Sequence, residues 1–133
     1  MGKNMKDYLV DTNILIYYFA SAIPENELNK IEKIFDESFT VSVITQIEFL
    51  GWDKHTEKGF ENAKEFLNQA NVITITDDIA DLAIRIRKSS KIKLPDAVIA
   101  ATSLNDNFIL VTRNDKDFRN VPDLEIYNPF HRV

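Results

Sequence analysis

Two kinds of hydrophobic pattern alternate along this chain. Short apolar or β-branched runs predict five strands, at residues 6–10, 39–43, 72–76, 108–111 and 124–127. The segments between them place apolar residues three and four positions apart, which predicts amphipathic helices. Strands that alternate with helices form a parallel sheet covered on both sides. The pattern therefore predicts an α/β fold, with a central parallel sheet of about five strands flanked by helices.

Three stretches of the chain have features beyond this alternation. Ile14–Ala20 has no polar face, so we expect a helix buried in the core or against another subunit. Thr45 and Glu48 have the spacing of a capping box, which is typical of a helix start. The stretch 112–119 is polar and charged and predicts a loop.

Composition narrows the class of protein. The length of 133 residues predicts one domain, residues 1–133, with residues 1–6 as a loose lead-in. Hydrophobic residues make up 44% and charged residues 28%, as in an ordinary soluble globular protein. The absence of cysteine excludes disulfides, thiolate zinc sites and cysteine nucleophiles, and fits a cytoplasmic location. The longest apolar run, Ile14–Ala20, is far too short to span a membrane.

Four acidic residues lie at strand-to-helix boundaries. Asp11 directly follows the first predicted strand, Glu48 lies just beyond the second, Asp96 starts a helix, and Asp117 follows the fourth strand. Ligands of such sheets bind outside the carboxyl ends of the strands, so we expect these acids to meet there. Carboxylates a few ångströms apart cannot all ionise cheaply, and a divalent cation neutralises them well. A bound Mg²⁺ also lowers the pKa of its water and stabilises charge on a phosphoryl group.

Each acid also has a plain structural explanation. Asp11 could be a helix N-cap, Glu48 the acid of the capping box, and Asp96 a favourable anion in a first helical turn. Asp117 could be a solvated loop acid. The net charge of −5 argues against a broad basic face for nucleic acid, although metal in an acidic pocket can attract phosphate. His55 and His131 lie near none of these segments and are expected at the surface.

The segments around these acids resemble a known family. Val10–Leu15, Val43–Glu48, Leu94–Ala101 and Leu110–Phe118 are similar in order and spacing to PIN-domain (PilT N-terminus) ribonucleases, in particular the VapC-type toxins of bacterial toxin–antitoxin pairs. The resemblance implies a three-layer PIN-like fold with four acids around one or two Mg²⁺ or Mn²⁺ ions. It further implies RNA cleavage by metal-activated water, a homodimer, and silencing by a cognate antitoxin protein.

The resemblance also carries over to individual residues. Asp11, Glu48 and Asp96 match the first three acids of the family, and Asp117 matches the fourth, with Asp115 as its rival. Asp11 and Asp96 are the expected direct metal ligands, while Glu48 and Asp117 hold metal or act on the attacking water. We expect further residues to hold the carboxylates in place or to contact substrate: Thr12, Asn13, Thr112, Arg113 and Asn114.

The sequence therefore predicts a metal-dependent endoribonuclease, the toxin of a type II toxin–antitoxin system. Lys91 and Lys93, just before Asp96, could steer RNA toward the site or form a plain solvated loop. The alternatives are a housekeeping PIN nuclease in RNA processing, a DNA-cleaving variant, and a non-catalytic PIN-like binding module. A phosphoaspartyl enzyme is a further rival, but Asn13 stands where a dehalogenase-like phosphatase needs a second aspartate.

Overall fold

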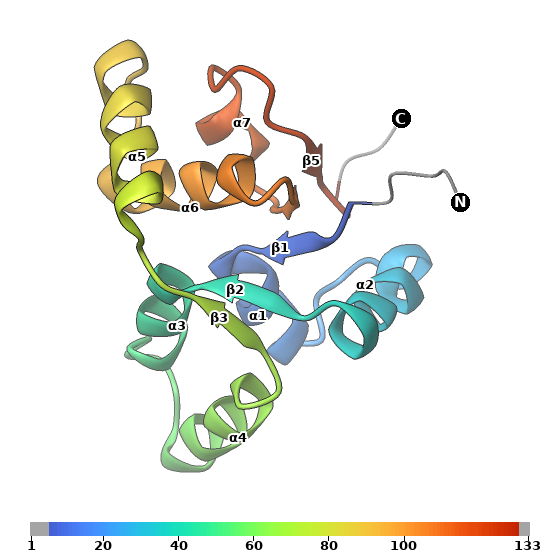
Figure 1. The fold of residues 1–133 in the computed structure, drawn as a ribbon. Coiled ribbons are helices and arrows are strands. Elements are labelled where there is room, and N and C mark those ends of the chain that lie inside the picture. Colours follow the sequence, from blue (N-terminus) through green and yellow to red (C-terminus); the bar gives the residue numbers. More distant parts are fainter. Residues whose placement is uncertain (1–5, 131–133) are drawn as a thin grey trace.

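The computed structural model describes residues 6–130, so residues 1–5 of the expected lead-in and His131 lie outside the described residues. Lys6 forms an ion pair with Glu125, with 2.6 Å between Nζ and Oε1. Short strands and helices alternate along the described chain (Figure 1). The elements are β1 (Tyr8–Val10), α1 (Thr12–Phe19), α2 (Glu25–Glu37), β2 (Thr40–Ser42), α3 (Val43–Leu50), α4 (Glu57–Leu67), β3 (Asn71–Ile73), α5 (Asp77–Ser89), α6 (Leu94–Asn105), β4 (Ile109–Val111), α7 (Asp115–Phe118) and β5 (Ile126–Tyr127).

The strands pair in parallel, as the sequence predicts, but in two hydrogen-bonded groups. One group has the order β1-β4-β5 and the other pairs β2 with β3. β1 of the first group and β2 of the second group lie side by side (Figure 1). They meet through side chains, and Val10 and Val41 belong to the same buried cluster. The expected single sheet of about five strands is therefore divided into three plus two.

Helices cover both faces of the strands and give the predicted three-layer α/β arrangement. Leu9 packs in a core with α5 and α6, whereas its neighbour Val10 packs in a core with α1 and α2. Leu110 and Val111 on β4 divide between the two cores in the same way. Successive side chains of a strand point to opposite faces, so this division shows that β1 and β4 are buried on both sides.

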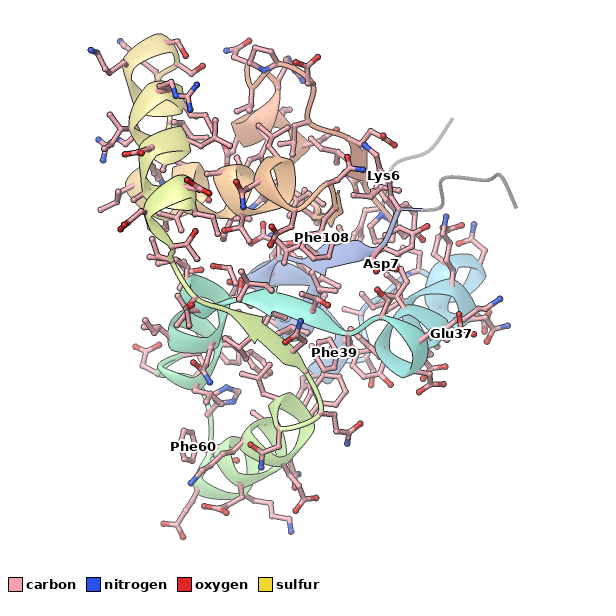
Figure 2. The ribbon with its side chains drawn as sticks, viewed as in Figure 1. Lys6, Asp7, Glu37, Phe39, Phe60 and Phe108 are labelled. Atoms are coloured by element: carbon pink, nitrogen blue, oxygen red, sulfur yellow. The ribbon has the colours of Figure 1, made fainter. Side chains whose placement is uncertain are left out.

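The strands all run toward one edge, where the site residues follow them. The chain enters β1 and leaves α2 at the opposite edge, near Lys6, Asp7 and Glu37 (Figure 2). In register, Val10 is the partner of Val111, which brings the residues after β1 and β4 together. No helix among residues 6–130 has the length and apolar character needed to cross a membrane.

Side-chain caps shift several element boundaries from those predicted. The β2 strand ends at Ser42, whose Oγ accepts a hydrogen bond from Ile44 N over 3.0 Å and so caps α3. Thr45 lies fully buried inside that helix, so the expected capping box of Thr45 and Glu48 is wrong. β3 ends at Ile73, because Thr76 already caps α5 through its hydroxyl.

The stretch 112–119 is not wholly a loop. It contains the short helix α7, and Phe118 at its end is 1% exposed. Burial of this aromatic ring against α6 fixes the helical turn, which the polar residues around it do not reveal. Helix α5 continues to Ser89, so only residues 90–93 connect it to α6.

Candidate active site

Asp11 is both a helix cap and the buried acid of the site. It follows β1, is 4% exposed, and its Oδ1 accepts a hydrogen bond from Thr12 N over 2.8 Å. Its Oδ2 accepts from Asn13 Nδ2 over 2.9 Å and from Thr112 Oγ1 over 2.8 Å. Asp11 therefore caps α1 and is also buried at the edge of the sheet.

The loop after β4 is tied to the start of α1 through Thr112. This buried hydroxyl donates to Asp11 and accepts from Asn13 Nδ2 (3.2 Å) and Asn114 N (3.0 Å). One donor and two acceptor positions are all that a threonine hydroxyl has. Arg113 N also donates to Asn13 Oδ1 over 2.9 Å. Thr112 and Asn13 thus make contacts that fix the orientation of the Asp11 carboxylate.

Glu48 approaches from α3 and is exposed. Its Oε1 accepts a hydrogen bond of 2.7 Å from Thr12 Oγ1, which also lies 3.2 Å from Thr45 Oγ1. Because α3 begins at Val43, Glu48 lies in its second turn and faces the start of α1. Thr12 therefore links the two helices and holds Glu48 beside the groove.

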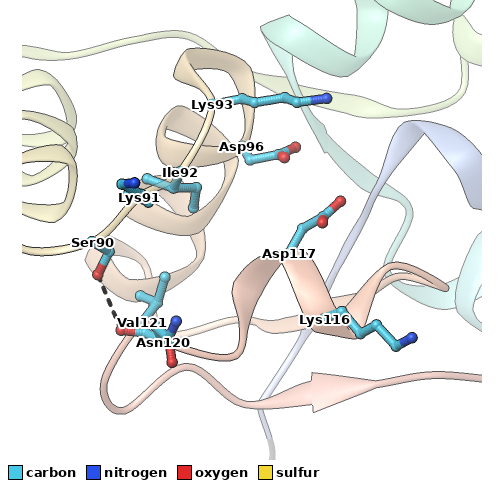
Figure 3. Close-up of a pocket in the computed structure, with 9 residues that line it drawn as sticks. All are labelled: Ser90, Lys91, Ile92, Lys93, Asp96, Lys116, Asp117, Asn120 and Val121. Atoms are coloured by element: carbon cyan, nitrogen blue, oxygen red, sulfur yellow. Dashed lines mark hydrogen bonds between the residues drawn. The ribbon is translucent and has the colours of Figure 1, made fainter.

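Asp96 and Asp117 form the other side of the site. Asp96 is half-buried in the first turn of α6, after Pro95, and Asp117 lies on α7. Their carboxylates point toward one another across a cavity of about 190 Å³ that both residues line (Figure 3). Asp115, the rival for the fourth position, does not line this cavity.

An open groove of about 650 Å³ joins three of the acids, Asp11, Glu48 and Asp96. Asp96 also lines the smaller cavity, so it connects the groove to Asp117. The structure therefore brings all four expected acids to the carboxyl edge of the strands. The expected supporting residues Thr12, Asn13 and Asn114 line the same groove.

Four groove residues were not expected from the sequence: Ile16, Gly51, Trp52 and Asp53. Trp52 is 36% exposed and lines the groove wall. Gly51 ends α3 directly before it, and a Cβ there would lie 2.7 Å from Ile47 O. Glycine at the end of that helix is the only signal that could have placed Trp52 at a turn.

Burial and the neighbouring acidic charges raise the pKa of two of the acids, Asp11 and Asp96. Burial raises the pKa of Asp11 to about 6, and the charges of Asp96 and Glu48 add to this, against the hydrogen bonds from Thr112 and Thr12. Burial also raises the pKa of Asp96, reinforced by Asp117 and Glu48 and opposed by Lys93. Lys6 and Glu125 form the only ion pair within residues 6–130, so no lysine or arginine is paired with these acids.

The donor set suits an oxygen-liganded cation. Within the described part of the chain, no three acidic or histidine side chains converge closely enough to form a metal cage. Three of the acids nonetheless offer carboxylate oxygens around the groove, and Asp117 lies in the adjoining cavity. No lysine or arginine of residues 6–130 is paired with any of the four. Hard divalent cations such as Mg²⁺ bind such oxygens while retaining waters, so a few carboxylates suffice. Asp11 and Asp96 could hold such an ion, with Glu48 and Asp117 beside it.

Comparison with known proteins gives consistent matches. A family model described as the PIN domain matches residues 8–124. A chain of a toxin–antitoxin complex from Klebsiella pneumoniae is 32% identical over 95% of this chain and all of that chain, with a TM-score of 0.77. A chain of DNA-bound VapBC from Salmonella typhimurium is 22% identical over 94% of this chain and 99% of that chain, with a TM-score of 0.79.

A chain of VapBC2 from Rickettsia felis, bound to a promoter DNA fragment, is 24% identical over 91% of this chain and 97% of that chain, with a TM-score of 0.77. The similarity to the Salmonella and Rickettsia chains concerns the fold. No curated protein matches the chain. The sequence-based resemblance to PIN-domain proteins is therefore confirmed by the family model and the solved structures.

Proposed function

This chain belongs to the PIN-domain family, and we propose that it is a metal-dependent endoribonuclease that acts as the toxin of a type II toxin–antitoxin pair. One observation carries the nuclease proposal. The carboxylates of Asp11 and Asp96 line an open groove, have raised pKa values, and are paired with no lysine or arginine in residues 6–130. A site that concentrates uncompensated acids destabilises the fold, which indicates a function that needs them.

The acids have distinct roles in this proposal. Asp11 and Asp96 would hold Mg²⁺ or Mn²⁺, as one ion or two. A divalent ion supplies an activated water and stabilises charge on the phosphoryl group. Glu48, exposed in the same groove, orients the attacking water or accepts its proton. Asp117 completes the site next to Asp96.

The remaining contacts keep this machinery in place. Thr112 and Asn13 fix Asp11, so its oxygens do not reorient when substrate arrives. Thr12 does the same for Glu48 through its hydroxyl. The groove is open rather than enclosed, which suits an RNA strand passing across it better than a small metabolite.

The toxin part of the proposal rests on the structural neighbours. The Klebsiella chain comes from a toxin–antitoxin complex, and the Salmonella and Rickettsia chains come from VapBC assemblies bound to DNA. These support a cognate antitoxin as the partner of this chain. A homodimer and a cytoplasmic location are part of the same proposal and rest on the family resemblance.

The nuclease proposal is tested with purified, partner-free protein and a mixed pool of RNA. We expect cleavage with Mg²⁺ or Mn²⁺ and none after addition of EDTA, followed by recovery when metal is returned in excess. Intact RNA under all metal conditions, with the protein folded by circular dichroism, would contradict the proposal. That result would favour the non-catalytic PIN-like binding module.

The toxin proposal needs a separate test. Expression of the chain in bacterial cells should arrest growth, and co-expression of a small protein encoded beside it should restore growth. Harmless expression of protein that still cleaves RNA in vitro would instead favour a housekeeping nuclease in RNA processing.

A further inference from the structure

A run of positive charge lies beside the acidic site. Between Leu82 and Pro95 the chain has five cations and no acid, in a protein with a net charge of −5. We call residues 85–93 the basic tract; its cations are Arg85, Arg87, Lys88, Lys91 and Lys93. The tract covers the last turns of α5 and the connection to α6. All five side chains are exposed.

The basic tract ends at the mouth of the acidic cavity. Lys91, Lys93 and Lys116 line the cavity of about 190 Å³ that Asp96 and Asp117 also line (Figure 3). A second hollow of about 490 Å³ is lined by Arg87 and residues 90–93. The two hollows share residues 90–93, so a positive rim continues from the acids outward along the end of α5.

The tract has a fixed path and no acidic partner. Ser90 Oγ donates a hydrogen bond to Asn120 O over 3.1 Å, which ties the connection to the segment after α7. None of the five cations forms an ion pair within residues 6–130. Favourable interaction with the carbonyl end of α5 explains Arg87 and Lys88, which lie in its last turn. It does not explain Lys91 and Lys93, which lie beyond the helix.

We propose that the basic tract binds the phosphates of an RNA strand on one side of the cleavage site. This inference rests on the proposed nuclease function, because it assigns the path of that substrate. A strand held at the acids must carry its next phosphates away from Glu48 and Asp117, which would repel them. The tract offers cations along a route that continues from the cavity shared by Asp96 and Asp117 into the second hollow. Lysine is depleted at protein–protein interfaces, so a polyanion fits this surface better than a protein partner.

The test compares two triple variants with equal loss of charge. Arg87→Gln/Lys88→Gln/Lys91→Gln removes much of the tract but keeps Lys93, which acts directly on Asp96. The control, Lys33→Gln/Lys58→Gln/Lys64→Gln, removes three exposed cations from α2 and α4, on the other side of β1 and β2 (Figure 1). Thermal melting of both variants checks that the fold is kept.

Binding is measured by fluorescence anisotropy with a labelled single-stranded RNA of mixed sequence, in EDTA and over a series of salt concentrations. We expect the tract variant to bind about tenfold more weakly at low salt. The slope of log Kd against log salt should fall by about 2, since each lost phosphate contact on a single strand removes about 0.7. In the cleavage assay KM should rise with kcat unchanged, because the tract binds substrate and transition state equally.

Each other outcome has a definite meaning. If the tract variant matches the control in affinity and salt slope, the inference is overturned while wild-type cleavage keeps the nuclease proposal. If the tract variant cleaves RNA normally but escapes inhibition by a co-expressed inhibitor protein, the inference is also overturned and the surface belongs to that protein. If no protein cleaves RNA but binding still depends on the tract, the nuclease proposal fails, while the binding of RNA phosphates by the tract stands.

Discussion

The two halves of the acidic groove are held in different ways. In the half formed by β1 and β4, Asp11 is buried and its two oxygens accept three hydrogen bonds. In the half formed by α6 and α7, the side chains of Asp96 and Asp117 accept no hydrogen bond from the described residues. The fold itself therefore fixes the first half. The second half keeps free carboxylate oxygens, which is what a metal ion or its bound water needs.

The largest expected effect comes from removing one acid of each half. Asp11→Asn and Asp96→Asn should each reduce RNA cleavage by about 100-fold or more, because each removes a charge from the reacting centre. Initial rates on mixed RNA with saturating Mn²⁺ measure this. The matched control is Asp81→Asn, an exposed aspartate on α5. Full activity of either site variant would refute its role.

The buried half should also make stability depend on pH in metal-free protein. The pKa of Asp11 is raised from 3.8 to about 6, so the folded state keeps this proton at higher pH than the unfolded chain does. The stability contributed by protonated Asp11 is fully present below pH 3.8 and is lost as the pH rises through about 6. The loss amounts to roughly 3 kcal/mol at most.

Urea unfolding in EDTA between pH 4 and pH 7 measures this loss. Asp11→Asn should show a smaller fall in unfolding free energy over this range than wild-type protein. It should keep part of the fall, because the pKa of Asp96 is raised as well. Asp81→Asn should fall as steeply as wild type. A wild-type protein that gains stability over this range would show that Asp11 is not destabilised by its burial.

The supporting hydroxyl of the fixed half should matter less than the acid itself. Thr112→Val keeps the shape of the side chain but removes one donor to Asp11 and the acceptor for Asn13 and Asn114. Such residues around a metal site typically affect metal affinity by about 10–100-fold. The Mn²⁺ concentration for half-maximal cleavage should rise accordingly. Thr102→Val, a buried hydroxyl bonded to Val98 O, should leave that concentration unchanged.

The smallest expected effect comes from the half formed by α6 and α7, where two neighbouring aspartates can be compared. Asp117→Asn should lower cleavage by about tenfold, because its charge acts on Asp96 across the smaller cavity. Asp115→Asn on the same short helix should stay within about twofold of wild type. If Asp115→Asn lowered cleavage more than Asp117→Asn, Asp115 would be the fourth acid of the site.

Much of this arrangement was predictable because it depends on local pattern. The apolar runs before Asp11 and Thr112 identify buried strands, and parallel pairing then places both residues at one edge. Four acids at strand-to-helix boundaries were enough to predict one shared site. The structure adds the two cavities that join these acids at the predicted edge.

The parts that were missed depend on contacts between distant segments. Ser42 and Thr45 are both residue types that cap helices. In the structure Ser42 caps α3, whereas Thr45 is buried inside that helix. Helix α7 is fixed by burial of Phe118 against α6, which no local pattern in a polar stretch reveals. Trp52 reaches the groove because α3 ends at Leu50 and Gly51 forms its C-cap. The ring of His55 packs edge-on against that of Trp52, with 5.1 Å between the ring centroids.

The hydrogen bond between Asp11 and Thr112 joins residues that are 101 positions apart. On a ribosome, where synthesis proceeds from the N-terminus, β1 and its aspartate emerge long before their partner strand β4 exists. Asp11 N also donates to Val111 O, so neither backbone nor side chain of this residue can take its final position earlier. A nascent chain that ends before β4 therefore lacks the assembled groove. The proposed nuclease activity thus requires that β4 has been synthesised and has paired with β1.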